Sequence, residues 1–266
     1  MLGTVELGLY NRAFNVITVP LSYLGSALTG VLFPVMAEVR SDQRRLRSAY
    51  LLSVQVTAMI AAPLCGWVLV AAPHIIGGLY GPGWEGAIAP LRVLAAGGLF
   101  RSVYHVAAAL THASANVMAE VRRQLMFAAL VAVGGLVGAS WGIAGVAAGV
   151  LGAMLFMYLA MAHLSLRIVD GGWRQFLTAQ LAGLGLGLFV GIGSAILQYV
   201  LERRGTSGPW ILGALTAAAP VFFALGIYLL PPALRPIDLF SRIDGSLQRL
   251  PTPVRLPLRR LMRVEV

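Results

Sequence analysis

The chain alternates between long apolar segments and short loops that hold most of its charged residues. A helix that crosses a bilayer needs about 20 consecutive apolar residues. By this criterion the pattern predicts an all-α fold, a polytopic transmembrane helix bundle. Its seven predicted membrane-spanning helices cover Phe14–Ala37, Ser48–Ala72, Ala87–Thr111, Gln124–Ser140, Ile143–Ser165, Arg174–Val200 and Pro209–Leu230.

Composition agrees with a membrane protein and narrows its partners. Of the 266 residues, 58% are hydrophobic and 11% are charged, and the formal net charge is +10. The arginines lie mainly in short loops and the C-terminal tail, where they act as orientation signals, so nucleic acid is not a predicted partner. The single cysteine, Cys65, excludes an internal disulfide, and no Cys/His spacing indicates a metal site. No cofactor is predicted.

The distribution of arginine predicts the orientation. The loop 38–47 contains four arginines, whereas the next loop, 73–86, contains no arginine or lysine. Cytoplasmic loops carry the excess of positive charge. Alternation then places fifteen loop and tail arginines inside and three outside, with the N-terminus outside and the C-terminus in the cytoplasm.

A charged side chain lies near the middle of the third predicted crossing. Arg101 would cost at least about 2.5 to 3.5 kcal/mol in lipid, so we expect it to face protein, water or substrate. His105 and His112 fall within about 40° of the same helix side. This cationic stripe indicates an anionic ligand. Arg92 points to the opposite side and is expected to extend toward the outer surface.

Acidic residues are scarce in the apolar segments. None of the ten Asp and Glu residues falls within the seven predicted crossings. A cation-coupling site would need such a carboxylate, so we expect none in this part of the protein.

Two ridges of small residues predict close helix packing. Ala179, Gly183, Gly187, Gly191 and Ala195 recur every four residues, and Gly134, Gly138 and Gly142 form a shorter ridge. Small residues allow helix backbones to approach closely inside a membrane.

The segment after the last crossing is amphipathic. Residues 236–250 place apolar side chains on one side and charged ones on the other, which predicts an interfacial helix. The basic residues beyond it are expected to contact anionic lipid or solvent.

Several other classes of protein can be judged by the residues that each would require. A retinal protein needs a lysine for its Schiff base, and the chain has none. A membrane-embedded glycosyltransferase or polymerase would display titratable side chains in sizeable outer loops, which are sparse here. Gly81–Gly86 fits the GxGxxG pattern but follows an apolar helix and contains Pro82, so it predicts a tight turn rather than a nucleotide site.

Three stretches in order carry a family resemblance. Leu7–Ala13 (LGLYNRA) resembles the pattern LGyYsrA, and Val31–Met36 (VLFPVM) resembles vlFPals. Leu79–Trp84 (LYGPGW), followed by Ala87–Leu94, resembles FGpxW…a…l.iL. These patterns are typical of polysaccharide transporters in the multidrug/oligosaccharidyl-lipid/polysaccharide exporter superfamily. The likeness is close over about residues 7–165.

The resemblance implies a domain organisation and a function. Residues 1–13 would form an external segment, 14–165 a five-helix bundle like the second lobe of the family, 166–230 two trailing helices, and 231–266 a basic cytoplasmic tail. Family members flip undecaprenyl-pyrophosphate-linked oligosaccharides across the bacterial inner membrane by alternating access between two lobes. A missing N-terminal lobe or a second copy would then be needed, and the abrupt N-terminus resembles an interhelical loop.

The resemblance also implies the partners and the site. Expected partners are the lipid-linked oligosaccharide, membrane lipids, and polysaccharide polymerase and export proteins. Arg101, His105 and then Arg12, which belongs to a matched motif, are the expected substrate-binding residues, and no covalent chemistry is implied. Two alternatives stay open: a drug or cation antiporter of the same superfamily, and a non-transporting membrane scaffold.

Overall fold

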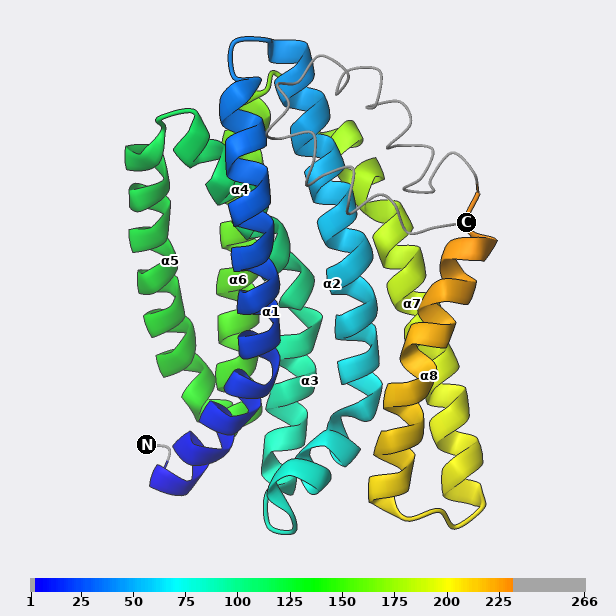
Figure 1. Ribbon diagram of the computed structural model, residues 1–266. Coiled ribbons are helices and arrows are strands. Elements are labelled where there is room, and N and C mark those ends of the chain that lie inside the picture. The colour runs from blue at the N-terminus through cyan, green and yellow to red at the C-terminus, as the bar shows by residue number, and fades with distance from the viewer. Residues whose placement is uncertain (1–2, 232–266) are drawn as a thin grey trace. The chain divides into compact units, whose positions relative to one another are not determined.

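A computed structural model describes residues 3–231, and this part of the chain is helical apart from its turns (Figure 1). Its elements are α1 (Thr4–Glu38), α2 (Gln43–Tyr80), the 3-10 helix η1 (Glu85–Ala87), α3 (Ile88–Ala96), α4 (Gly98–Ala113), α5 (Val117–Gly138), the 3-10 helix η2 (Ala139–Trp141), α6 (Gly142–Ile168), α7 (Trp173–Arg203) and α8 (Gly208–Leu229). The predicted all-α class is confirmed for these residues.

The number of spans depends on how broken helices are counted. Five helical segments are long and apolar enough to cross a membrane, and the α3–α4 pair brings the total to six. That pair bends by 43° next to Gly97, so the third predicted crossing is a broken helix. Helices α5 and α6 lie in one 52-residue segment, which turns at Gly142, where φ is +73°. Each of the seven predicted crossings thus falls on a helix or a helix pair.

Contacts made by the turns between helices show which helix ends lie together. Arg47 donates from Nε to the carbonyl oxygen of Val169 at 3.0 Å and from Nη2 to Asp170 Oδ2 at 3.0 Å. These bonds join the start of α2 to the turn between α6 and α7. At the other end, Arg12 lies over the rings of Tyr80 and Trp84. The arginine-rich loop and the α6–α7 turn therefore share one end, as the predicted alternation requires.

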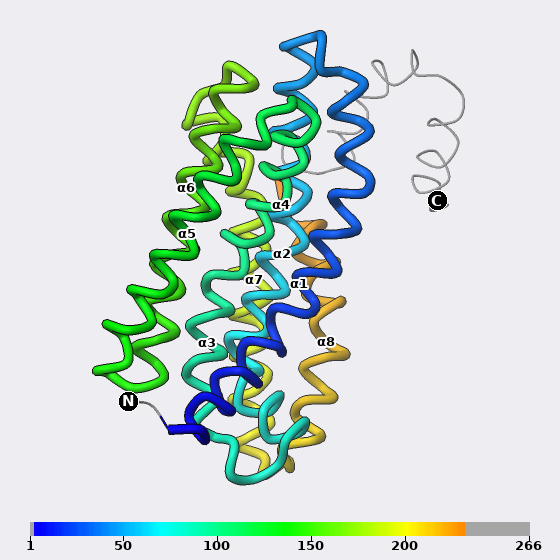
Figure 2. Tube along the Cα trace, turned by 90° about the vertical axis from the view of Figure 1, so that its left-hand side faces the viewer, coloured from blue at the N-terminus to red at the C-terminus, as the bar shows by residue number. Residues whose placement is uncertain are grey.

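Helices α2 and α4 form the interior of the compact unit that ends at Tyr228. Helix α4 packs against α1, α2 and α6, while α7 runs along α2. Helix α5 lies beside α6 (Figure 2). Most of the residues of α5 are exposed. Leu125, Leu136 and other apolar side chains are among them, as expected for helices in contact with lipid.

The predicted small-residue ridges lie where α7 packs against α2 and where α5 packs against α6. A Cβ atom added at Gly183 would overlap the backbone of Ala58 in α2, and one at Gly187 would lie 2.8 Å from the Ala62 carbonyl oxygen. Between α5 and α6, Gly138 similarly faces Gly145. Gly142 is not part of this ridge, because it forms the turn that precedes α6.

Two predicted features concern the ends of the chain. Helix α1 begins at Thr4, so most of the predicted external segment 1–13 is helical. The predicted interfacial helix and basic tail, residues 236–250 and beyond, lie outside the described residues.

Candidate functional site

Helix α4 brings Arg101 and His105 to one small pocket. The two residues are four apart in the sequence, so they lie on the same face of the helix. The pocket has a volume of about 120 Å³. It is lined from α4, α5 and α6 by Phe100, Arg101, Tyr104, His105, Gln124, Phe127, Met154 and Met157. The predicted pair of cationic candidates is thus brought together.

The Arg101 guanidinium is half-buried and only partly satisfied. Its Cζ lies 6.0 Å from the centroid of the Phe14 ring in α1, a cation–π distance. Its Nε is buried and has no acceptor among the described residues. An unpaired buried donor is costly, so it marks a place where an acceptor from a ligand would be stabilised.

The His105 ring is held against α1 at a glycine. A Cβ atom added at Gly25 would lie 2.5 Å from His105 Cδ2, so only a glycine leaves room for the ring there. The neighbouring Tyr104 ring lies 5.4 Å away between centroids. His105 Nε2 is buried and has no hydrogen-bond partner in the described part of the chain. Both cationic candidates that line the pocket therefore carry a buried nitrogen atom without a partner among the described residues.

A buried carboxylate lies beside this pocket, in contrast to the expectation from the sequence. Glu120, in the first turn of α5, is 8% exposed. Its Oε1 accepts from Tyr104 Oη at 3.0 Å, and its Oε2 lies 2.7 Å from Thr111 Oγ1 and 3.0 Å from His112 Nε2. The expectation that the apolar segments contain no carboxylate is wrong, because α5 begins at Val117 rather than at Gln124.

Tyr104 connects the carboxylate to the pocket. Its hydroxyl lies 3.0 Å from Glu120 Oε1 and 3.4 Å from Gln124 Oε1, and both Tyr104 and Gln124 line the pocket. His112, by contrast, pairs with Glu120 and does not line the pocket. Sequence reasoning missed Tyr104, Gln124 and Glu120. The signal was available for Glu120, since an acidic residue is favoured in the first turn of a helix.

Arg12 lies elsewhere. Its Cζ is 5.7 Å from the centroid of the Tyr80 ring and 5.9 Å from that of Trp84. It holds α1 against the turn between α2 and η1, where Gly81 and Gly83 have φ values of +78° and +92°. The structure does not bring Arg12 to the pocket of Arg101 and His105.

The side chains around the pocket are suited to binding an anionic group. Among residues 3–231, no group of three or more His, Cys, Asp or Glu side chains is placed to hold a metal ion. The pocket offers the nitrogen donors of Arg101 and His105 and the amide of Gln124, beside aromatic and methionine side chains, while the Tyr104 hydroxyl already donates to Glu120. Nitrogen donors of this kind match an anionic group, whose oxygen atoms accept hydrogen bonds.

Comparison with known proteins supports the resemblance seen in the sequence. Residues 1–89 match the family model described as "Polysaccharide biosynthesis protein". The lipopolysaccharide biosynthesis protein WzxC of Escherichia coli is 27% identical over 206 residues, which are 76% of this chain and 40% of that protein. The succinoglycan biosynthesis transport protein ExoT of Rhizobium meliloti is 33% identical over 96 residues, 35% of this chain and 19% of that protein.

A third relative extends the range of organisms. The teichuronic acid biosynthesis protein TuaB of Bacillus subtilis is 28% identical over 100 residues, 38% of this chain and 21% of that protein. The chain thus spans less than half the length of these relatives, and no solved structure matches it. The fold and the comparisons show a multi-pass membrane protein that is similar, over part of its length, to bacterial polysaccharide biosynthesis and transport proteins.

Proposed function

We propose that this chain takes part in moving lipid-linked oligosaccharides across the bacterial inner membrane. In this proposal the diphosphate of an undecaprenyl-pyrophosphate-linked saccharide binds at Arg101, with His105 as a second donor. The chain binds and moves its ligand and does no covalent chemistry on it. Arg12 acts at the end of the bundle, where it fixes the turn that contains Tyr80 and Trp84.

The observation that carries the proposal is the buried, unpartnered Nε of Arg101. A guanidinium inside an apolar segment is costly unless a ligand or a neighbour uses it, and membrane-embedded charges commonly mark substrate pathways. Phe14 contacts the guanidinium through its ring and accepts no conventional hydrogen bond. A phosphate oxygen would supply the missing acceptor, in the planar geometry that arginine prefers.

The size of the pocket indicates which part of the ligand it receives. At about 120 Å³ it is smaller than the roughly 300 to 1,000 Å³ of sites that enclose a whole small ligand. It therefore suits one charged group, while the saccharide and the polyprenyl chain lie outside it.

Orientation and partners form part of the same proposal. Seven crossings with the N-terminus outside place the arginine-rich loop 38–47 in the cytoplasm, in agreement with the excess of positive charge there. Alternating access needs a second wall opposite the pocket. The relatives are longer than this chain, so we propose that further helices or a second copy supply that wall. Polysaccharide polymerase and export proteins would act on the product.

One observation favours the antiporter alternative, namely the buried carboxylate of Glu120. A site for a cationic drug needs such a group. Its oxygens already contact the side chains of Tyr104, Thr111 and His112. This occupation favours a structural role, so the anionic ligand is the better match. Ethidium binding that is lost in Glu120→Gln and kept in Arg101→Gln would favour the antiporter.

Binding of undecaprenyl diphosphate to the purified full chain tests the proposal. We expect Arg101→Gln to weaken binding by about tenfold or more, the factor that corresponds to 1.4 kcal/mol. Arg101→Lys should keep part of the affinity, because it retains the charge but loses the bidentate fork. Arg122→Gln, an exposed arginine on α5, is the matched control. Equal affinity of Arg101→Gln and wild type in well-folded samples would exclude Arg101 from the site.

A further inference from the structure

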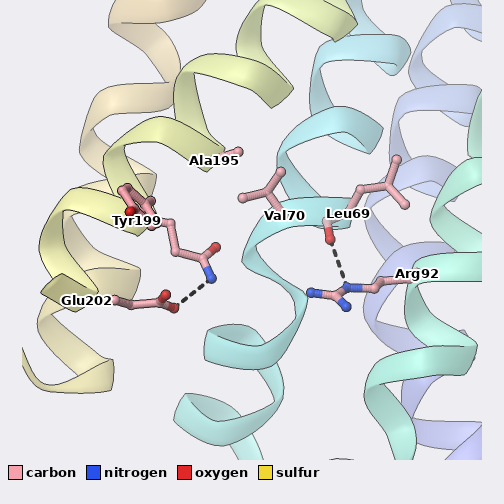
Figure 3. Close-up of a pocket in the computed structure, with 7 residues that line it drawn as sticks. Leu69, Val70, Arg92, Ala195, Tyr199 and Glu202 are labelled. Atoms are coloured by element: carbon pink, nitrogen blue, oxygen red, sulfur yellow. Dashed lines mark hydrogen bonds between the residues drawn. The ribbon is translucent and has the colours of Figure 1, made fainter.

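A second, larger cavity lies between α2, α3 and α7 (Figure 3). It shares no lining residue with the Arg101 pocket. Its volume is about 320 Å³. Arg92 lies on its α3 side and Glu202 on its α7 side, with Leu69, Val70 and Ala195 between them. The cavity therefore contains one cation and one anion on opposite walls.

Arg92 is held in place by a gap in the hydrogen bonding of α2. Pro73 has no N–H group and so cannot donate to the carbonyl oxygen of Leu69, four residues earlier. Arg92 Nε donates to that oxygen instead, at 3.2 Å. The Nη groups have no partner among the described residues and remain available to a ligand. Arg92 was expected simply to extend toward the surface, but this bond fixes it at the cavity wall.

The Glu202 side chain is also positioned by its neighbours. Gln198 Nε2 donates to Glu202 Oε1 at 2.8 Å. His74 Nε2 lies 3.3 Å from the same oxygen, although it is not aligned for a hydrogen bond. No described residue bonds to Oε2, which leaves this oxygen available.

Arg92 and Glu202 form no ion pair with each other, although both line the cavity. Two separated, opposite charges match a ligand that carries both an anion and a cation. The wall between them is apolar, and apolar side chains continue along the exposed side of α7, where Ile192 and Ile196 are 59% and 61% exposed. This combination of a dipolar site and an adjoining apolar surface matches a phospholipid.

We propose that this cavity binds the head group of a phospholipid that has a primary ammonium, such as phosphatidylethanolamine. The phosphate is bound by the Nη groups of Arg92, and the ammonium donates to Glu202. An acidic lipid without an ammonium would place its negative head group near Glu202, and a choline head group has no N–H to donate. The acyl chains lie along α7 beside Ile192 and Ile196. The site does not depend on the saccharide function proposed for Arg101.

Native mass spectrometry of the full chain tests the assignment, with equimolar phosphatidylethanolamine, phosphatidylglycerol and phosphatidylcholine added. We expect wild type to retain phosphatidylethanolamine over phosphatidylglycerol by about tenfold, which corresponds to 1.4 kcal/mol. Glu202→Gln should remove this preference, and Arg92→Gln should reduce retention of phosphatidylethanolamine itself. Glu6→Gln, at a partly buried position in α1, and Arg122→Gln, at an exposed position in α5, change residues that do not line the cavity; these matched controls should behave as wild type. An unchanged preference in Glu202→Gln would overturn the proposal.

Two further arms separate the remaining explanations. Arg92 also bonds α2, so Arg92→Lys is included: it should retain more phosphatidylethanolamine than Arg92→Gln because it keeps the positive charge. Equal loss in both variants would overturn the role of the charge. Soluble glycerophosphoethanolamine carries the same phosphodiester and ammonium charges without acyl chains. Complete displacement of the lipid by this compound at millimolar concentration would assign the site to a soluble zwitterion and contradict a lipid site. Binding of undecaprenyl diphosphate should be unaffected in Glu202→Gln. The phospholipid proposal and the diphosphate proposal can therefore be contradicted separately.

Discussion

The contact between α2 and α7 predicts different stabilities for two glycine substitutions two residues apart. Gly183 is buried against α2, and a Cβ atom there would overlap the carbonyl carbon of Ala58 and lie 2.7 Å from its Cβ. Gly185 is exposed on the same helix, and a Cβ atom there would meet nothing within 4 Å. Gly183→Ala and Gly185→Ala therefore add the same methyl group to the same helix in different surroundings.

The magnitudes follow from two terms. Alanine is favoured over glycine in a helix by about 0.8 to 1.0 kcal/mol, a gain available to both variants. At Gly183 the helices must also separate by about 1 Å to restore carbon contacts of about 3.5 Å or more. Overpacking of this kind costs about 1 to 3 kcal/mol. We expect the free energy of unfolding of Gly183→Ala to lie about 1 to 3 kcal/mol below that of Gly185→Ala.

Reversible unfolding in mixed micelles, with denaturing detergent as the variable, measures this difference. Gly185→Ala should equal or exceed wild type in stability, while Gly183→Ala falls below Gly185→Ala. A shift of the same sign and size in both variants would refute the close packing of α2 on α7, because helix propensity alone would then explain the data.

Further predictions concern topology, the buried carboxylate and the aromatic contacts of Arg12. Reporter fusions within 39–42 should indicate the cytoplasm and fusions at Gly83 the outside; a cytoplasmic signal at Gly83 would reverse the proposed orientation. Glu120→Gln should lower the free energy of unfolding by about 1 to 3 kcal/mol, because it weakens hydrogen bonds to a buried charged group, whereas Glu6→Gln should be nearly silent in the same unfolding measurement. Arg12→Gln should raise amide hydrogen exchange in 81–84, since the cation–π contacts with Tyr80 and Trp84 contribute about 0.5 to 1 kcal/mol; unchanged exchange there would argue against those contacts.

The helices could be predicted from the sequence because each apolar segment is long and bounded by charged or turn-forming residues. The break at Gly97 could not, since the apolar pattern continues through it without a proline. The bend depends instead on tertiary packing, as Gly97 lies against Leu151 and Met154 of α6.

The candidate site was predictable only where its members share one helix. Arg101 and His105 are four residues apart, and that spacing alone places them together. Tyr104, Gln124 and Glu120 meet across α4 and α5, and no sequence spacing encodes that contact. Arg12 and Trp84 both lie in motifs that carry the family resemblance, but their pairing likewise depends on how α1 packs against the end of α2.

The distance between Arg101 and the diphosphate is the most direct test of the proposed site. Solid-state NMR can measure dephasing of ¹⁵N-labelled arginine by ³¹P, with the full chain reconstituted in a phosphorus-free glycolipid, so that undecaprenyl diphosphate is the one source of ³¹P. We expect a phosphorus within about 4 Å of an arginine Nη, as charge-assisted hydrogen bonds require. That signal should disappear in Arg101→Gln and persist in Arg122→Gln. Dephasing that is unchanged in Arg101→Gln would place the diphosphate elsewhere and contradict the proposed site.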